Sequence, residues 1–347
     1  MKSSILEHIV CPSCSSNLTL KIKSKTNNEI IEGMLNCQNC KEKFKIVKGV
    51  PRFVVDKTKD FVRTEDAFSA KWKSHHTNHH AKDWIEWQKN WFLDRFDFKS
   101  IKLFNTFLKP QKLILDAGTG IGNSAKLLSI NKTSTVFGID ASDSIDFAYK
   151  KYGKSSNIHF IQADIRQLPF RKSFFNYILS EQVLHHTKNT ETSFKYLTKF
   201  LKKNGHISIY VYNKKAPMRE YADDFIREKT IKMSISECTQ FSKDMAILGK
   251  SLSKLKKKII IPRDIPLLGI KSGTYDVQRF IYWNFLKCFW DESDNLERSI
   301  GVNFDWYYPK FAYRHTPKEV KKWYRDVKLK ISSFKETESG ISVTGKK

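Results

Sequence analysis

The sequence of 347 residues lacks any apolar run that approaches the ~18 residues of a membrane-spanning helix. Its first residues, MKSSILEHIVCPSC, hold only a short apolar stretch that cysteines interrupt, which does not fit a secretory signal peptide. With 40% hydrophobic and 13% aromatic residues the chain can still build a substantial core, and its length allows two or three units. We therefore expect a soluble, cytoplasmic protein.

Arginine is scarce in an otherwise basic chain, because 12 arginines stand beside 50 lysines at a formal net charge of +26. Such a charge is compatible with an anionic partner such as RNA or a membrane surface. Bidentate recognition of phosphates and bases favours arginine, however, and the lysines are spread along the chain apart from a cluster at Lys254–Lys258. The composition favours a general lysine bias, and RNA is the less favoured partner.

Cysteine is also infrequent, but four of the six cysteines form two C-x-x-C pairs separated by 22 residues. Each pair can turn two thiolates inward, and two such pairs complete a tetrahedral zinc site. The segment between them reads as two short strands around a polar turn at Thr26–Asn28. The pattern predicts a zinc ribbon with a structural Zn²⁺ ion on Cys11, Cys14, Cys37 and Cys40. Cys238 and Cys288 are expected to be buried packing residues.

Residues 56–108 are charged and aromatic, and Trp84, Trp87 and Trp91 recur at helical spacing. We expect helices here that pack on a core or cover a ligand site. His75, His76, His79 and His80 resemble a metal cluster in their spacing, but no acidic ligand accompanies them. A solvated polar segment is the favoured interpretation of these histidines.

The segment KLILDAGTGIGNSAKLL, Lys112 to Leu128, combines an apolar run, three alternating glycines and the start of a helical pattern. A strand, a tight glycine turn and a helix start are what a nucleotide-type cofactor needs. The third glycine of the dinucleotide motif G-x-G-x-x-G is missing, because position 123 is Asn123. On this segment alone, a nicotinamide or flavin site, an S-adenosylmethionine (SAM) site and a loop without ligand stay open.

The next predicted strands each end in an acidic residue. The strand TVFGID ends at Asp140, 24 residues after Asp116, where ribose hydroxyls are commonly bound. The strand IHFIQADI ends in Asp164-Ile165, and an acid beside an apolar residue suits an adenine. The fourth strand is predicted in FFNYILSEQVLHHT, Phe174 to Thr187. A helix is expected to end at Gly205 as its C-cap, and a fifth strand follows at His206–Tyr212.

This succession resembles the class I SAM-dependent methyltransferases, in particular the type-11 enzymes that include those of ubiquinone biosynthesis. The residues that carry the resemblance are LDAGTGIG, GIDAS, ADIRQLPF, FFNYILSEQVLHH and the strand after KKNG. It implies an α/β fold with a Rossmann-like seven-stranded sheet whose last strand is antiparallel. It also implies a set of residues around SAM: Asp116, Gly118 and Gly120 at the methionine end, Asp140 at the ribose, Asp164 and Ile165 at the adenine, and Glu181 and Gln182 facing the sulfonium.

The ribbon in turn resembles the small zinc-ribbon activator proteins of tRNA and protein methyltransferases, through ILEHIVCPSC, CQNC and GVPRF. The methyltransferase fold ends in a helix and a β-hairpin, and the matching helix here is Thr316–Val327, with a threonine cap and proline at its first position. An insertion of mostly helical pattern therefore precedes it. We expect five parts: a ribbon (1–55), a helical linker or cap (56–108), a SAM-binding core (109–213), a helical insertion forming an acceptor-pocket lid (214–310) and a C-terminal helix and hairpin (311–347).

Methyl transfer from SAM requires mainly that acceptor and methyl group are positioned, and a base only where the acceptor carries a proton. His185 and His186, after the fourth strand, are the candidates for that base. The chain has no D/N-P-P-Y after this strand and no catalytic cysteine in the motif loops, which disfavours methylation of adenine amines and of pyrimidine C5. We expect transfer to an O or C atom of a small-molecule, sugar or lipid-linked acceptor. The alternatives are an rRNA or tRNA methyltransferase that uses the ribbon and the basic surface, and a non-enzymatic SAM-binding scaffold.

Overall fold

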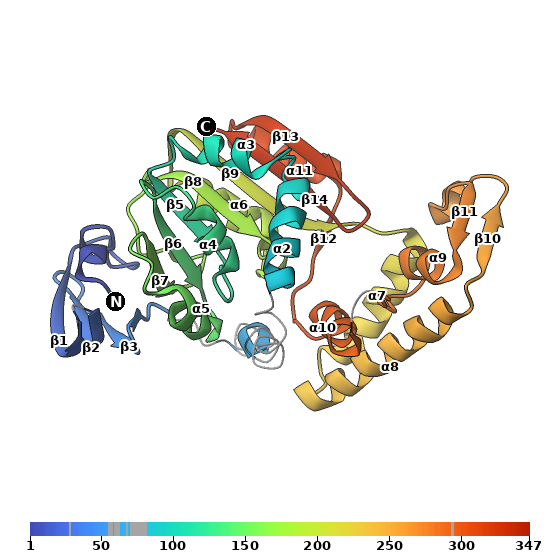
Figure 1. The fold of residues 1–347 in the computed structure, drawn as a ribbon, viewed down its shortest axis with the longest axis horizontal. Helices are drawn as coiled ribbons and strands as arrows, with labels where there is room; N and C mark the ends of the chain where they lie inside the picture. The colour runs from blue at the N-terminus through green and yellow to red at the C-terminus, as the bar shows by residue number, and fades with distance from the viewer. Residues whose placement is uncertain (28, 55–57, 59–62, 67–68, 70–81, 293–294) are drawn as a thin grey trace.

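The computed structural model describes residues 1–27, 29–54, 58, 63–66, 69, 82–292 and 295–347. The four histidines between positions 75 and 80 lie outside the described residues. The molecule has three parts along its long axis, with the N-terminal ribbon at one end, a large sheet in the middle and a helical insertion at the other end (Figure 1). No helix in the described part of the chain is long and apolar enough to cross a membrane.

The central sheet has the Rossmann-like arrangement that the sequence predicts. Its strand order is β13-β14-β9-β8-β5-β6-β7, all parallel except β14, which is antiparallel to β9 and β13. The bounds are β5 Leu113–Ala117, β6 Thr135–Asp140, β7 Ile158–Gln162, β8 Phe175–Glu181, β9 Leu201–Asn213, β13 Lys330–Glu336 and β14 Gly340–Lys346. A two-residue strand, β12 (Arg314–His315), adds to β9 in parallel. The predicted fold class is confirmed.

Alternating apolar residues bury both faces of this sheet. Along β5, Ile114 belongs to one core cluster and Leu115 to the other, as the two-residue period of a strand requires. One face carries α3 (Ile101–Leu108), α4 (Asn123–Leu128) and α5 (Ser144–Tyr152), and the other carries α6 (Thr190–Thr198) and α11 (Pro317–Asp326). The parallel strands therefore end together at one edge, where side chains from different strands converge.

The segment before the fifth strand differs from the sequence expectation. Helix α6 ends at Thr198, and β9 begins at Leu201 and runs through Gly205, so Gly205 is not a helix C-cap. A Cβ at Gly205 would lie 3.0 Å from the carbonyl oxygen of Asn176 and 2.9 Å from the Leu201 side chain. The glycine therefore permits the close approach of β9 to β8 rather than the end of a helix.

The ribbon is a separate four-stranded antiparallel sheet, and the residues that follow its last strand lie beside β7. Its strands are β1 Leu18–Thr26, β2 Glu29–Cys37, β3 Lys43–Val47 and β4 Val50–Pro51, preceded by the 3₁₀ turn η1 Ser3–Glu7. The Phe53 amide donates to the Gln162 carbonyl at 2.7 Å, and Arg52 forms an ion pair with Asp146 of α5. The α-amino group of Met1 donates to the Tyr149 hydroxyl at 2.9 Å. The ribbon is thus part of the same packed body as the sheet.

The insertion forms a helical layer with a small core of its own, in which Cys238 and Cys288 are fully buried, as predicted. Its elements are α7 Pro217–Thr230, α8 Ile235–Lys254, α9 Val277–Asn284 and α10 Leu296–Tyr307, with the 3₁₀ turn η3 Pro266–Leu268. The sequence analysis did not foresee the antiparallel pair β10 Lys258–Ile261 and β11 Gly273–Asp276. Helix α2 (Lys82–Arg95) lies between this layer and the sheet (Figure 1).

Candidate active site

A cavity of about 1150 Å³ separates the carboxyl ends of the parallel strands from the insertion. Ligand sites in proteins commonly measure ~300–1,000 Å³, so this volume is enough for a cofactor together with a second small molecule. Seven of the eight predicted cofactor residues line it: Gly118, Gly120, Asp140, Asp164, Ile165, Glu181 and Gln182. The eighth, Asp116, does not.

The glycine loop after β5 has the backbone conformation that its sequence implies. Gly118 and Gly120 have φ values of 91° and 54°, in the left-handed region that glycine tolerates. A Cβ on Gly118 would also lie 2.2 Å from a methyl carbon of Val183. The Gly118 and Thr119 amides both donate to the Ile139 carbonyl, at 2.9 and 2.7 Å, which ties the loop to β6.

Asp116 supports the glycine loop from below instead of facing the cavity. Its side chain is 1% exposed, and its Oδ2 accepts from the Thr119 hydroxyl at 2.6 Å. Burial raises the pKa of the Asp116 carboxyl to about 7. Asp116 is not among the residues that line the cavity, and its role at the methionine end of a cofactor stays a prediction.

Asp140 stands at the end of β6 with both carboxylate oxygens engaged. Oδ2 accepts from the Gly120 amide at 2.8 Å, and Oδ1 accepts from the Ser142 amide at 2.9 Å and the Ser142 hydroxyl at 2.6 Å. Burial raises its pKa. The carboxylate thus holds the glycine loop and the turn before α5 together while it lines the cavity.

A second group of acids surrounds the end of β7. Asp164 forms an ion pair with Arg166, whose Nε donates to Oδ2 at 2.9 Å, and Ile165 lies beside it in the cavity wall. Glu65 enters from the segment before α2, and its Oε1 is buried without a hydrogen-bond partner within the described residues. Burial, and then the charges of Asp140 and Asp164, raise the pKa of Glu65 to about 8. The sequence analysis missed Glu65, because an acid in a charged segment has no local pattern to mark it.

The middle of the cavity contains a buried ion pair between Glu181 at the end of β8 and Arg95 at the end of α2, with Oε1 and Nη1 3.0 Å apart. The Arg95 guanidinium lies 3.2 Å from the centre of the Trp91 ring and 3.6 Å from that of Tyr210. Burial raises the pKa of Glu181, and Arg95 opposes that shift. Arg95 fixes the Glu181 carboxylate in the cavity, and sequence reasoning did not identify this partner.

The two candidate histidines have different surroundings. His185 is fully buried, is not among the cavity-lining residues, and packs its ring 3.8 Å from that of Tyr212. His186 lines the cavity, and its Nδ1 is 2.7 Å from the Phe311 carbonyl. A carbonyl only accepts, so this contact places the proton on Nδ1. His185 therefore packs inside the fold, and of the two candidate histidines it is His186 that lines the cavity.

The four predicted metal ligands come together away from this cavity. The sulfur atoms of Cys11, Cys14, Cys37 and Cys40 lie within 4.8 Å of one another, and none of the four lines the cavity. A Zn²⁺ ion with bonds of ~2.3 Å to four thiolates requires sulfur–sulfur distances of ~3.8 Å. The closest pairs are 3.4 and 3.5 Å apart, so the group could hold such an ion.

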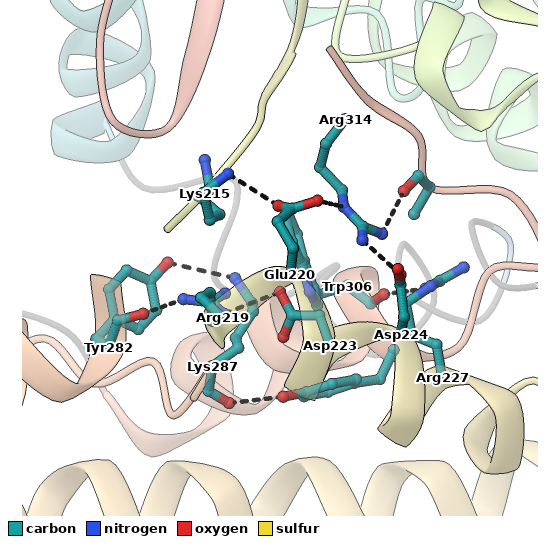
Figure 2. Close-up of polar contacts among 12 residues, drawn as sticks. Lys215, Arg219, Glu220, Asp223, Asp224, Arg227, Tyr282, Lys287, Trp306 and Arg314 are labelled. Carbon is teal, nitrogen blue, oxygen red and sulfur yellow. Dashed lines mark hydrogen bonds and ion pairs between the residues drawn. The ribbon is translucent and has the colours of Figure 1, made fainter. Parts of the chain in front are cut away.

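The opposite wall of the cavity consists of basic and aromatic residues of the insertion (Figure 2). Arg219 is fully buried, and its Nε donates to Asp223 Oδ2 at 2.8 Å. Arg314, on β12, joins this layer to the sheet through ion pairs with Glu220 at 3.0 Å and with Asp224. These ion pairs hold α7 against the strand that leads back to the core.

Residues 115–209 match a protein family described as a methyltransferase domain. Phosphoethanolamine N-methyltransferase 2 of Caenorhabditis elegans is 31% identical over 121 residues, which is 34% of this chain and 28% of that protein. Sterol 24-C-methyltransferase of Pneumocystis carinii is 25% identical over 107 residues, 30% of this chain and 28% of that protein. The chain thus spans little more than a quarter of the length of these curated relatives.

A solved S-adenosylmethionine dependent methyltransferase from Mesorhizobium loti has 12% sequence identity to this chain and a TM-score of 0.43. The superposition covers 72% of this chain and 97% of that one. The family match contains the glycine loop, Asp140, Asp164 and Glu181. Residues 115–209 are thus similar to a methyltransferase domain, and the ribbon and the insertion lie outside this matched segment.

Proposed function

On the premise of that domain, we propose that this protein is a SAM-dependent methyltransferase that acts on a small-molecule acceptor. The observation that carries the proposal is the single cavity that extends from the glycine loop to the insertion. The names of the curated relatives support it, because phosphoethanolamine and sterols are small acceptors. The accepting atom, O or C in the sequence interpretation, stays a prediction.

The residues at the strand ends fit the cofactor by their chemistry. Asp140 presents a buried carboxylate where hydroxyl groups of a ribose would donate, and Asp164 with Ile165 offers an acceptor beside an apolar surface for an adenine. Gly118 and Gly120 keep the loop free of Cβ atoms, so a ligand can approach the backbone. When bound, SAM supplies a methyl group already activated by its sulfonium.

The remaining chemistry belongs to the chain. Arg95 and Glu181 form a rigid polar floor, and the aromatic wall of the insertion excludes water from the reacting atoms. With its proton on Nδ1, a neutral His186 has Nε2 as its basic atom and can take a proton from an acceptor that carries one. An acceptor without such a proton needs only positioning.

Binding of SAM to the Asp140→Asn variant tests the cofactor site. We expect the affinity to fall about tenfold or more, because one charged hydrogen-bond acceptor is worth ~1.5–3 kcal/mol. The matched control is Asp143→Asn, an exposed acid three positions on, which should bind SAM like the native chain. Equal affinity for all three proteins, measured by calorimetry, contradicts the ribose role.

Transfer itself is tested with methyl-labelled SAM and a cell extract, with and without nuclease. Label in nuclease-resistant small molecules supports the proposal, and its loss in His186→Asn supports the base. Label that nuclease treatment releases would show that the acceptor is an RNA and not a small molecule. Binding of SAM without label in any fraction would instead favour a non-enzymatic protein.

We further propose that Cys11, Cys14, Cys37 and Cys40 hold a structural Zn²⁺ ion. Their convergence within 4.8 Å supports this role. A ribbon of ~50 residues has too small a core to be stable alone, so a metal ion would complete it. Zinc content and thermal unfolding of the Cys37→Ala variant test this assignment.

A further inference from the structure

The insertion wall of the cavity is rich in cations. Among the described residues of the insertion, five cationic side chains line the cavity against two carboxylates, Asp291 and Asp305. The cations are Lys215, Arg219, Arg279, Lys287 and Arg298. Arg279 and Asp291 are 3.9 Å apart, at the limit of an ion pair. The wall therefore carries more positive charge than its own acids balance.

Three of these cations lie within 6 Å of the centre of the Trp306 ring, and Figure 2 labels all four residues. The nitrogen of Lys287 lies 4.8 Å from the centre of the Trp306 ring, the guanidinium carbon of Arg219 5.5 Å and the nitrogen of Lys215 5.9 Å. They come from three separate segments: the link after β9, helix α7 and the link between α9 and α10. The fold thus brings three positive charges together. Their contacts with the aromatic ring offset the repulsion between them only in part.

Within the described residues, neither Lys215 nor Lys287 forms an ion pair with a carboxylate. Lys287 is 4% exposed, and its ammonium contacts the Tyr282 hydroxyl at 3.4 Å. The Lys215 ammonium donates to the carbonyl groups of Glu338 and Ser339, between β13 and β14. Burial, followed by the charge of Arg219, lowers the pKa of Lys287 to about 7 and that of Lys215 to about 7. The carboxylates of Asp223 and Asp305 oppose the shift of Lys287, and those of Glu220 and Asp223 oppose that of Lys215, but burial outweighs them. A ligand anion close to the two nitrogens would therefore stabilise their charged forms.

The same wall contains an unused hydrogen-bond donor. The indole Nε1 of Trp306 is buried and has no hydrogen-bond partner in the described part of the chain, and Trp306 lines the cavity. An indole N–H only donates, so its partner must be an acceptor atom. Buried donors are nearly always paired in native proteins, and an oxyanion in this wall would satisfy the indole and both ammonium groups.

We propose that Lys287, Lys215 and Trp306 bind an oxyanion of the methyl acceptor, so that the acceptor is a small molecule with a phosphate or carboxylate group. The inference rests on the proposed function, which it extends by naming the acceptor class. Because Lys287 is almost completely buried, the anion has to enter the cavity, which favours a compact acceptor over the backbone of a folded RNA.

The proposal is tested on the full chain saturated with S-adenosylhomocysteine, so that the carboxylate of the cofactor product is already bound. Inorganic phosphate, acetate and a ten-nucleotide single-stranded RNA are titrated into it by calorimetry. We expect saturable binding of phosphate or acetate, weakened tenfold or more in Lys287→Met. Tighter binding of phosphate assigns a phosphoryl group to the acceptor, and tighter binding of acetate assigns a carboxylate.

The matched control is Lys243→Met, which removes an exposed lysine of α8 in the same insertion and should leave anion binding unchanged. Lys287→Arg keeps the charge and should retain most of the affinity. If Lys287→Met fails to fold, Lys215→Met gives the same test from the other side of the Trp306 ring. Both variants that fold should bind S-adenosylhomocysteine with native affinity, because these lysines stand on the insertion wall and not at the glycine loop.

Three results overturn the inference: no saturable binding of either anion, binding equal in the native chain and Lys287→Met, or RNA binding that depends on Lys287 while the small anions do not bind. A failure of the proposed function is distinct, because the native chain would then not bind S-adenosylhomocysteine. Binding of phosphate and acetate, measured in the absence of S-adenosylhomocysteine, would still show whether the insertion wall binds anions.

Discussion

At the scale of single residues, the cofactor end of the cavity is acidic. Asp140, Asp164 and Glu65 face the same volume, and Arg166 is bound to Asp164. Burial and mutual repulsion disfavour three negative charges together, so one proton is retained by the group least well solvated by hydrogen bonds. Glu65, whose Oε1 has no partner within the described residues, is that group.

This arrangement predicts a pH effect on stability that depends on Glu65. Its pKa is raised from 4.5 to about 8 in the folded chain, so between these values the folded state holds a proton that the unfolded state has lost. The contribution of Glu65 to the free energy of unfolding is therefore full below about pH 4.5 and falls as the pH rises toward 8. Between pH 5 and pH 8, we expect the free energy of unfolding to fall less in Glu65→Gln than in the native chain. Urea unfolding measures this difference.

The control is Glu86→Gln, because Glu86 is exposed and forms its ion pair with Lys89 at the surface. This variant should follow the native pH profile. Asp116 and Asp140 also have raised pKa values, so the native profile falls for several reasons and only the difference between variant and native chain reports Glu65. Parallel profiles for Glu65→Gln and the native chain contradict the assignment.

At the scale of elements, helix α11 shows how local sequence starts a helix and tertiary packing keeps it. Thr316 and Glu319 form a capping box, with the Glu319 amide 3.3 Å from the Thr316 hydroxyl and the Thr316 amide 2.6 Å from Glu319 Oε2. The helix then buries Val320, Trp323 and Tyr324 against the sheet, and the Tyr324 hydroxyl donates to the Val343 carbonyl of β14 at 2.9 Å. The C-terminal helix and β14 thus stabilise each other.

Removing the cap should loosen both elements. We expect Thr316→Ala to lower the free energy of unfolding by ~1 kcal/mol, because the N-terminal amides of α11 lose their side-chain acceptor. Thr316→Ser keeps the hydroxyl and should remain within a few tenths of a kcal/mol of the native value. Urea unfolding gives the magnitude, and hydrogen exchange should rise first at Glu319 and Val320. A loss of the same size in both variants would mean that the threonine methyl, not the cap, is responsible.

At the scale of the whole molecule, the ribbon and the central sheet form one body. Arg52 and Phe53, which follow β4, contact Gln162 at the end of β7, and Asp164 lies two residues further along the chain. A change in the ribbon can therefore reach Asp164 in the wall of the cavity through β7. The aromatic and apolar core of the ribbon also joins that of the sheet, with Phe44 and Phe53 in the same cluster as Phe137.

Loss of the metal ion should therefore destabilise more than the ribbon. We expect Cys37→Ala, or treatment with a chelator, to remove bound zinc and to lower the thermal midpoint by ~5 °C or more, at roughly 2 °C per kcal/mol for a chain of this size. Affinity for S-adenosylhomocysteine should fall as well, because the edge of β7 loses its neighbour. Zinc content, thermal unfolding and calorimetry measure the three effects.

Cys238→Ala provides the comparison, since it removes a buried cysteine of the insertion that is remote in sequence from both C-x-x-C pairs. It should keep its zinc, and any loss of stability should come from packing alone. Native stability in the zinc-free chain would mean that the four cysteines do not hold a structural ion.

The sequence by itself determined the parts whose signals are local. Alternating apolar residues define the strands, the glycines after β5 are required by their positive φ values, the two C-x-x-C pairs turn their thiols inward, and Thr316 with Pro317 starts α11. Gly205 shows the limit of such reasoning, because a glycine near a helix end also suits close contact between strands, and only the neighbouring strand β8 decided between them.

Tertiary structure alone decided which of the candidate groups meet. Arg95 reaches Glu181, and Glu65 reaches Asp140 and Asp164, across sequence separations that carry no periodic signal. Burial separated His185, which packs on Tyr212, from its neighbour His186, which lines the cavity. The basic wall around Trp306 likewise exists only once three distant segments are packed together, because charge and burial are properties of the assembled surface and not of any one segment.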